Sequence, residues 1–457
     1  MRRPSISVLG QALLFLIPML LIGYVFKRHE TSALLLFFGF WFLVYAWILK
    51  SYKQTDFQFW IAASIVFRLA LLAALPYLSD DFYRFVWDGR LLVNGYHPFA
   101  ELPGYYLSGE LTVPGINQSL YGNLNSPEYF TIYPPIAQFV FWLAVQVAPN
   151  SVIGSVIVMR IVLILTEVGT ILLLLKLVRH FGLAEKRVLL YALNPLVIIE
   201  LTGNLHFEAV VIFFILVGIY FLVQSRVASA GVSFACAIST KLLPLIFLPL
   251  FVMRIGLKKS FILYLSAGFT CVFLFAPLFN LEIINKFGQS VELYFNKFEF
   301  NASIYYIVRE YGYLTKGYNV IQTVGWKLAV LSTSLILLYS FVPLKLVRKD
   351  GKWILDRRFG SIYLTSRLPQ AMMWVLFIYL LFTTTVHPWY ITTLLMLSIF
   401  TNYRFVLVWT ALIFLTYAGY SEFAFVEVLP LTILQYVVVI GYLAYELLWI
   451  ERETSLA

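Results

Sequence analysis

Long apolar runs separated by short polar segments dominate the chain. A membrane-spanning helix needs about 20 mostly apolar residues, and many of these runs approach that length. The clearest candidate spans are 9–26, 32–49, 57–78, 151–178, 187–202, 208–224, 260–280, 320–343, 370–386, 404–420 and 428–449. Three further runs are short or interrupted: 134–148, 388–400 and 227–253, the last with Lys241 near its middle. The pattern predicts an all-α polytopic membrane protein.

Composition and charge support this prediction. The 457 residues are 61% hydrophobic and 12% charged, with a mean hydropathy of +0.85, whereas a soluble domain carries about 25% charged residues. Lys and Arg number 33 against 23 Asp and Glu, but the basic residues are scattered through short loops, which argues against a nucleic-acid surface. Cys236 and Cys271 lie inside apolar runs and are predicted to pack as small core residues.

The positions of Lys and Arg favour one topology, because short inner loops of membrane proteins are rich in these residues. Most of them fall inside if 134–148 lies along the outer interface and 227–253 is two short helices broken near Ser239–Lys241. The rival topology, in which both segments cross as single helices, moves several basic loops outside. It also buries Lys241 in the bilayer at a cost of about 2.5–3.5 kcal/mol.

We therefore predict about 14 spans, both termini inside and amphipathic helices on the outer leaflet. The chain is a single integral-membrane domain over 1–457, with a basic inner loop at 345–367. Its predicted parts are two N-terminal spans (9–49), a core (57–280) with an outer loop (79–133), a second outer loop (281–318) and C-terminal spans (320–449).

The start of the first outer loop, 79–90, has the spacing of an amphipathic helix in which Asp81, Arg84 and Asp88 share one face. One interpretation is the solvated polar face of an interfacial helix. The other is that the adjacent Asp80 and Asp81 supply a general base, since a carboxylate beside another negative charge and near apolar surface holds a proton more tightly. The residues alone leave both interpretations open.

Charged residues inside the predicted spans need partners. Arg160 and Glu167 are seven residues apart on one helical face, which predicts a structural ion pair between them. Arg68 and Glu200 are expected to have structural roles as well.

The motif Asp80-Asp81-x-Tyr83-Arg84-x-x-Trp87-Asp88-Gly89-Arg90, followed by Asn94-Gly95-x-x-Pro98-Phe99, resembles the first outer loop of GT-C glycosyltransferases. It most resembles that of the polyprenol-phosphate-mannose-dependent α-mannosyltransferases. Glu208 stands where these enzymes more commonly have Asp, which keeps the charge and adds a methylene. The other matching segments are Tyr133-Pro134-Pro135-Ile136, Asn194-Pro195, Gly203-Asn204-x-His206-x-Glu208, Thr240-Lys241-x-x-Pro244-Leu245, Phe298-Glu299-Phe300-Asn301-Ala302-Ser303 and His387-Pro388-Trp389-Tyr390.

The resemblance implies a GT-C-type fold and an inverting enzyme in a bacterial inner membrane, with its active site outside. Such an enzyme moves a hexose, by resemblance mannose, from a polyprenyl-phosphate donor to a hydroxyl of a glycan or lipid-linked acceptor. By the same resemblance Asp81 is the catalytic base, with Asp80 as the alternative. The other function considered is a transporter or flippase of a lipid-linked sugar. Transporters often show two related halves and ionisable groups near the bilayer centre. In this sequence the two halves do not match, and the candidate polar groups collect at the predicted outer side.

Substrate-binding residues are expected where negative charge develops during the reaction. The leaving phosphate becomes more negative in the transition state, so a cation beside it is stabilising; Lys241 is the first candidate, Arg309 the second and Arg84 the third. Each has a plainer alternative as a snorkelling, anchoring or ion-paired residue. Asp88 is expected to bind substrate hydroxyls or to orient Arg84. The remaining predicted substrate-binding residues are Tyr133, His206, Glu208 and His387.

The sequence leaves open whether a metal ion or another cofactor binds. Asp81, Asp88, His206 and Glu208 could together hold a divalent metal ion, which some GT-C enzymes use and others do not. The four residues lack a tight ligand spacing.

Overall fold

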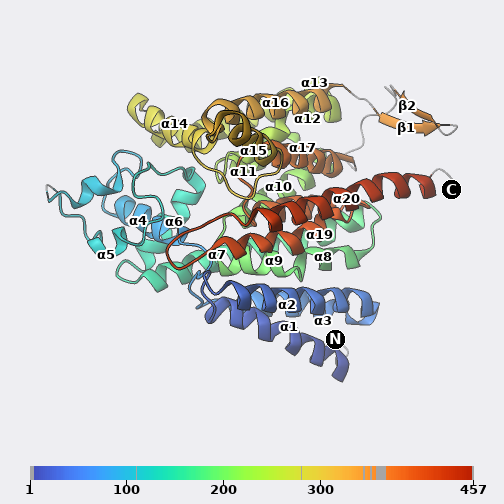
Figure 1. Ribbon diagram of the computed structural model, residues 1–457, viewed down its shortest axis with the longest axis horizontal. Helices are drawn as coiled ribbons and strands as arrows, with labels where there is room; N and C mark the ends of the chain where they lie inside the picture. The colour runs from blue at the N-terminus through green and yellow to red at the C-terminus, as the bar shows by residue number, and fades with distance from the viewer. Residues whose placement is uncertain are drawn as a thin grey trace.

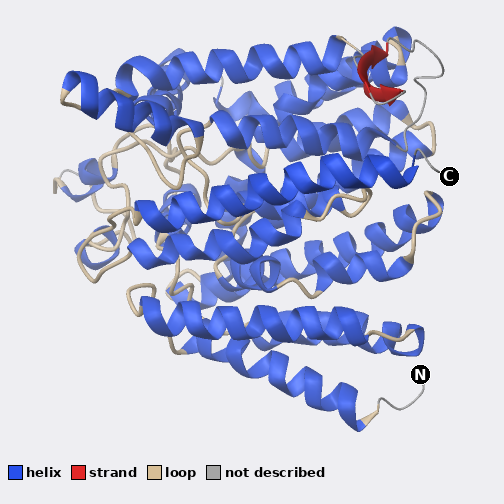
Figure 2. Ribbon diagram, turned by 45° about the vertical axis from the view of Figure 1, so that its right-hand side comes forward, coloured by secondary structure: helices blue, strands red, loops and turns tan. Residues whose placement is uncertain are grey.

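The computed structural model describes residues 5–109, 111–278, 280–342, 345–349, 352–356 and 367–454. Arg2, Arg3, Glu110 and parts of the predicted inner loop 345–367 lie outside these residues. The described chain is mostly helical, with one short β-hairpin (Figure 2).

The first part of the chain contains an N-terminal helical hairpin, a third helix, the outer loop with its short helices, and one long helix. These elements are α1 (Ile6–Tyr24), α2 (Thr31–Ser51), η1 (Gln54–Asp56), α3 (Phe57–Ala70), α4 (Asp81–Val93), η2 (Pro103–Leu107), α5 (Gln118–Tyr121), α6 (Pro135–Val147) and α7 (Val152–His180).

The middle part is built from short and broken helices that end in a longer apolar one. The elements are η3 (Glu185–Val188), α8 (Leu189–Ala192), α9 (Pro195–Val197), the π-helix η4 (Ile198–Gly203), α10 (Glu208–Val223), α11 (Val227–Ile238), η5 (Leu243–Phe247), α12 (Leu248–Ile255), α13 (Leu257–Phe275) and η6 (Ala276–Leu278).

The last part holds two amphipathic helices, the hairpin and the C-terminal helices. The elements are α14 (Leu281–Asn296), α15 (Ile304–Lys316), α16 (Ile321–Phe341), β1 (Lys345–Lys349), β2 (Lys352–Asp356), α17 (Leu368–Phe382), α18 (Tyr390–Ser398), α19 (Phe405–Leu412), η8 (Ile413–Gly419) and α20 (Leu429–Thr454).

The long helices lie roughly along one direction, and the two ends of this bundle differ (Figure 1). Helices α4, α5 and α6, with the loops around them, gather at one end. The start of α1, the end of α20 and the β1–β2 hairpin lie at the opposite end. This arrangement agrees with the predicted topology, in which the loop 79–133 and the two termini lie on different sides.

The number of long spans is smaller than predicted. By length and apolar composition, six helices of the described chain can cross a membrane, or seven if the bent pair Pro195–Gly203 and Glu208–Val223 is one span. The predicted span 57–78 is helical only as far as Ala70, and 187–202 divides into η3, α8, α9 and η4. The estimate of about 14 spans is therefore not confirmed, because many apolar runs fold as short or broken helices.

The break predicted near Ser239–Lys241 is confirmed. Helix α11 ends at Ile238 and η5 begins at Leu243, so Lys241 lies between two short helices. The β1–β2 hairpin, in contrast, was not predicted. Its strands pair antiparallel from Lys345↔Asp356 to Lys349↔Lys352, within the segment that was predicted to be a plain inner loop.

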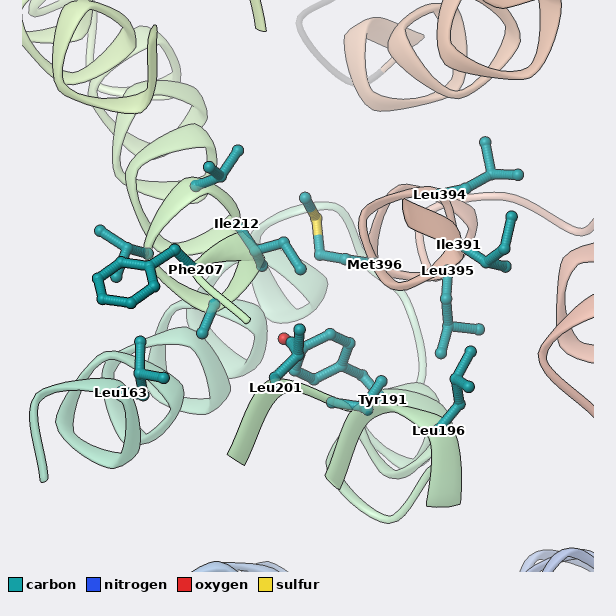
Figure 3. Packing of buried hydrophobic residues seen from close by; sticks show 14 of the residues in the cluster. Leu163, Tyr191, Leu196, Leu201, Phe207, Ile212, Ile391, Leu394, Leu395 and Met396 are labelled. Atoms are coloured by element: carbon teal, nitrogen blue, oxygen red, sulfur yellow. The ribbon is translucent and has the colours of Figure 1, made fainter. Parts of the chain in front are cut away.

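Apolar side chains face outward along several helices, as lipid contact requires. In the stretch Leu257–Leu278 only 11% of the most apolar window is buried, and Phe261, Leu265 and Phe269 are exposed along one face of α13. Inside the bundle, Met396 of α18 points toward Ile212 of α10 (Figure 3). The core thus joins the broken helices of the middle part to α18.

The predicted ion pair between Arg160 and Glu167 is wrong, because Glu167 pairs with Arg68 instead. The Arg68 Nη2 and Glu167 Oε2 atoms are 2.9 Å apart, and both side chains are fully buried. Tyr191 donates a further hydrogen bond of 2.6 Å to Glu167, and Arg68 donates to the carbonyl of Ala192. This network ties α3, α7 and α8 together.

We expect loss of one partner of this pair to destabilise the protein, because the other charge is then buried without compensation. Arg68→Met or Glu167→Gln should each lower the free energy of unfolding by about 3–5 kcal/mol. The double variant Arg68→Met/Glu167→Met should lose less than either single variant. Reversible unfolding in mixed detergent micelles measures the effect, and a loss below about 1 kcal/mol for both single variants would contradict it.

Candidate active site

The adjacent carboxylates Asp80 and Asp81 lie at the beginning of α4 and have different partners. Asp80 is the N-cap residue of the helix, and both side chains are half-buried. Arg28, from the loop between α1 and α2, forms an ion pair of 2.5 Å with Asp80. Asp81 accepts a hydrogen bond of 2.6 Å from the Asn125 amide. Within the described chain Asp81 has no direct ion pair, so it is the carboxylate whose charge remains available.

Arg84 and Asp88 point into the outer loop. The Arg84 Nε and Asp88 Oδ1 atoms are 2.9 Å apart, and both side chains are buried. Thr131 and Gln138 donate hydrogen bonds of 2.5 and 2.8 Å to the other oxygen of Asp88. Of the two roles predicted for Asp88, this geometry favours the orientation of Arg84. Together with Gln138 they attach the loop to α6; a substrate contact of Arg84 or Asp88 stays a prediction.

Gly89 explains why α4 can approach α6 so closely. A Cβ atom added at this position would lie 2.5 Å from the carbonyl oxygen of Phe141, which is too close for any side chain. Tyr133 supports the same packing, since its ring meets those of Phe85 and Phe141 edge to face at 4.9 and 5.5 Å. The loop motif that contains Gly89 therefore includes residues that fix the helix as well as candidate reactive groups.

A strained turn carries His206 and Glu208. It follows the π-helix η4, and Leu205 has a φ of +61°, an uncommon conformation for a residue with a side chain. Arg160 holds this turn: it donates hydrogen bonds of 2.8 and 2.9 Å to the carbonyls of Thr202 and Gly203. π-turns and strained backbone often occur at functional sites.

Glu208 and Lys241 form an ion pair across two helix interruptions. Glu208 is the first residue of α10, and Lys241 lies in the break between α11 and η5. Their Oε1 and Nζ atoms are 2.5 Å apart, with side-chain exposures of 3% and 24%. The Lys241 ammonium also lies 5.8 Å from the centre of the Tyr390 ring. Lys241 is thus held at a fixed place while part of it stays accessible.

Three rings form a stack beside this ion pair. The His206 and Trp389 rings are 3.5 Å apart between centroids, and Trp389 and His387 are 4.4 Å apart at an angle of 7°. Phe300 covers the other side of His387 at 4.7 Å. The segment between α17 and α18 is thereby fixed to the turn that carries His206.

The elements that carry these side chains pack together. The helix that begins with Asp81 packs against the turn before α10, with the Phe85 and Phe207 rings 5.5 Å apart between centroids, and Asp81, Glu208 and Lys241 all contribute to the electrostatic field at His206. Burial lowers the pKa of His387 to about 3, and His206 and Lys241 lower it further. His387 is therefore a neutral hydrogen-bonding group at ordinary pH.

Several polar atoms at this place are buried without a hydrogen-bond partner: His206 Nε2, Glu208 Oε2 and His387 Nδ1. The His206 atom lies 3.4 Å from a carboxylate oxygen of Glu200. Buried polar atoms in folded proteins are nearly always hydrogen-bonded. Within the described residues, these three atoms are thus the polar atoms of this cluster that lack a hydrogen bond.

Arg309 lies in a neighbouring network. It pairs with Glu299 and Glu310, each at 2.9 Å, and its guanidinium is 4.1 Å from the centre of the Tyr306 ring. Glu299 directly precedes Phe300, which joins the ring stack through His387. Arg309 is thus linked to the site through Glu299 and Phe300. Because two carboxylates pair with Arg309 and one with Lys241, Lys241 is the stronger candidate for binding the phosphate.

The described residues do not fit a metal site. Among them, no three His, Cys, Asp or Glu side chains gather as metal ligands would. Of the four candidates named from the sequence, Asp88 pairs with Arg84 and Glu208 with Lys241. We therefore derive no step through a metal ion.

Sequence reasoning missed Arg28, Asn125 and Tyr420. The Arg28 guanidinium lies 5.2 Å from the centre of the Tyr420 ring, and Tyr420 experiences the charges of Arg28 and Asp81. One signal was available for Arg28, because an arginine in a predicted outer loop runs against the positive-inside rule.

Comparison with known proteins identifies the family. Residues 15–256, more than half of the chain, match the family described as alpha-(1->6)-mannopyranosyltransferase, N-terminal domain. The chain belongs to this family. The matched range contains Asp81, His206, Glu208 and Lys241, whereas Arg309 and His387 lie beyond it.

Curated relatives carry the same description. The chain is 24% identical over 218 residues to alpha-(1->6)-mannopyranosyltransferase B of Corynebacterium glutamicum, a match that covers 43% of the chain and 34% of the relative. It is 26% identical over 189 residues to alpha-(1->6)-mannopyranosyltransferase A of the same bacterium, covering 41% and 36%. The Mycobacterium tuberculosis alpha-(1->6)-mannopyranosyltransferase A is 25% identical over 227 residues, covering 48% and 42%. The chain thus matches well under half of each relative's length.

The Glu208–Lys241 pair gives a prediction on stability. Lys241→Gln leaves the Glu208 carboxylate buried without its cation, and we expect it to lower the free energy of unfolding by about 1–3 kcal/mol. Lys241→Gln/Glu208→Gln should recover part of this loss, because the buried charge is removed as well. Unfolding in detergent micelles measures the cycle.

A matched control uses an exposed ion pair. Arg179 and Glu185 are 2.7 Å apart, but their side chains are 60% and 28% exposed. Arg179→Gln should cause no measurable loss, since exposed pairs contribute little. Equal losses for Lys241→Gln and Arg179→Gln would contradict the role of the Glu208–Lys241 pair.

Proposed function

We propose that the protein is an inverting mannosyltransferase that uses a polyprenyl-phosphate-linked donor. It moves mannose to a hydroxyl of a glycan or lipid-linked acceptor, with Asp81 as the general base. The observation that carries this proposal is the packing of α4 against the turn before α10, through the Phe85 and Phe207 rings at 5.5 Å. It places Asp81, which has no ion pair within the described chain, on a helix packed against the turn that leads into the Glu208–Lys241 pair. Membership of the mannopyranosyltransferase family supports the sugar and the reaction class.

Inversion requires the acceptor hydroxyl and the leaving phosphate to lie on opposite sides of the anomeric carbon. The base that removes the hydroxyl proton must therefore face the group that receives the negative charge. Asp81 begins α4, whose Phe85 ring packs against Phe207 at 5.5 Å, and Lys241 pairs with Glu208, the residue after Phe207. A sugar bound between the two charged groups fits this arrangement. Asn125 donates to one oxygen of Asp81, which orients the carboxylate and leaves its other oxygen for the hydroxyl proton.

Lys241 is suited to receive the phosphate. An ammonium group carries three donors, and Glu208 accepts from one of them. The remaining donors can bind phosphate oxygens as their charge grows, an interaction that is stronger near a membrane than in bulk water. Leu245, four residues further along the same motif, is an exposed apolar residue, which suits an approach of the prenyl chain from the lipid.

The sugar hydroxyls would find partners at His206 Nε2, Glu208 Oε2 and His387 Nδ1, the buried polar atoms without hydrogen bonds. The neutral His387 can donate or accept, according to its tautomer. A sugar bound there would satisfy all three atoms at once.

The proposed location is the inner membrane of a bacterium, with the site on the outer face and a role in glycan biosynthesis of the cell envelope. The relatives named alpha-(1->6)-mannopyranosyltransferase come from bacteria. A transporter or flippase of a lipid-linked sugar is not favoured, because the family is one of sugar transferases.

The assignment of the base predicts different outcomes for two neighbouring residues. Asp81→Asn should lower the rate of mannose transfer by about 10²–10⁴-fold, the usual contribution of a general base. Asp80→Asn should keep the rate within about tenfold of the unchanged protein. The assay uses purified protein in lipid vesicles with labelled polyprenyl-phosphate mannose and an α-mannoside acceptor. Full turnover by Asp81→Asn would remove the base assignment.

The donor class is tested by a panel of sugars. We expect transfer from polyprenyl-phosphate mannose, less from the glucose analogue, and none from a nucleotide-linked mannose, which lacks the prenyl chain. Lys241→Met should raise the KM for the lipid donor and lower kcat, because the phosphate loses its cation in both the ground state and the transition state. Entry of the labelled lipid into sealed vesicles without any transfer would instead favour the transporter.

A further inference from the structure

Arg28 reaches the active-site end from a separate part of the chain. It lies in the short loop between α1 and α2, and its guanidinium pairs with the Asp80 carboxylate at 2.5 Å. The other contact of the guanidinium is the ring of Tyr420, at 5.2 Å from its centre. Two elements distant in sequence, the start of α4 and the segment after η8, thus hold this arginine.

The segment that carries Tyr420 is itself well fixed. Tyr420 and Phe425 form an isolated antiparallel bridge, and the Ser421 hydroxyl donates to the Ala424 carbonyl at 2.7 Å. Gly419 lets the two sides of this turn approach, since a Cβ there would lie 2.6 Å from the Val426 carbonyl oxygen. The ring that faces Arg28 therefore belongs to a defined turn.

The charge of Arg28 matters because Asp80 and Asp81 are adjacent. An unpaired negative charge beside a carboxylate raises the pKa of that carboxylate, whereas a neutralised neighbour does not. Arginine is suited to this task, since its guanidinium stays charged at every relevant pH. With Asp80 paired to Arg28, Asp81 is the member of the couple that has no ion pair within the described chain.

We propose that Arg28 is a positioning residue for the transfer reaction: it occupies Asp80 and thereby selects Asp81 as the base. This inference rests on the proposed function, because it concerns the residue that removes the acceptor proton. It also gives the N-terminal hairpin α1–α2 a role in the reaction, as the element that delivers Arg28 to the site.

The groups that face Asp81 come from four places in the chain. Asn125 of the outer loop donates to it, and His206 and Tyr420 lie within its electrostatic range. Asp80 is its neighbour in sequence and forms an ion pair with Arg28. Substituting Arg28 removes the cation that pairs with Asp80 and does not alter the other groups directly.

The test is the pH profile of mannose transfer. In Arg28→Gln the Asp80 charge is uncompensated, so an unpaired negative charge stands beside the base. The acid limb of the kcat/KM profile should move up by about half to one pH unit. Arg28→Lys, which keeps the charge, should leave the limb near its original position.

The decisive variant is Arg28→Gln/Asp80→Asn, in which both charges of the pair are absent. The acid limb should return to the position found in the unchanged protein, because no extra negative charge then faces Asp81. Lys27→Gln is the matched control: Lys27 is exposed in the same loop, and the substitution removes the same charge without touching Asp80. It should leave the profile unchanged.

Three results would overturn the inference. One is an unshifted acid limb in Arg28→Gln; another is a shift that Arg28→Gln/Asp80→Asn does not reverse. The third is a rise in the donor KM with an unchanged pH profile, which would make Arg28 a phosphate ligand. If Asp81→Asn is inactive in the same assay while any of these occurs, the proposed function stands and only the role of Arg28 fails.

Discussion

The ion pair between Glu208 and Lys241 joins two places where membrane helices are interrupted. Each interruption exposes backbone groups that need partners in an apolar surrounding, and each carries one charge that needs the other. The 2.5 Å contact satisfies the second requirement, whereas backbone groups at the breaks have hydrogen bonds such as that from the Ile136 N–H to the Ser239 carbonyl, at 2.9 Å. Because Glu208 follows the turn that carries His206, the pair also fixes the distance between the broken helices and the ring stack of His206, Trp389 and His387.

The rest of the site is arranged around this pair by contacts that do not take part in chemistry. Arg160 holds the carbonyls of Thr202 and Gly203 and so keeps the strained turn in place. Arg84 and Asp88 attach the outer loop to α6, which sets the position of Asp81 at the start of α4. Arg84 and Asp88, which are also predicted to contact substrate, thus support the position of Asp81 from within the outer loop.

Local features were predictable from the sequence where one residue type determines the backbone. The break at Lys241 followed from a charge within an apolar run, and the start of α4 followed from the acidic pair before an amphipathic pattern. Long-range partners were not predictable. Helical spacing suggested Glu167 for Arg160, but the partners are the carbonyls of Leu72 and of Thr202 and Gly203 in the π-helix η4. Such carbonyls leave no mark in the sequence. Apolar runs likewise predicted spans without indicating which of them would fold as short helices.

In the proposed reaction Lys241 receives the donor phosphate while Asp81 faces the sugar from the other side. The most direct measurement is an electron cryomicroscopy structure of Asp81→Asn with polyprenyl-phosphate mannose bound. We expect a phosphate oxygen at about 3 Å from the Lys241 ammonium, with the mannose ring between Lys241 and the side chain at position 81. A phosphate bound at Arg309, or a lipid headgroup at the end of the bundle that carries the β1–β2 hairpin, would contradict it.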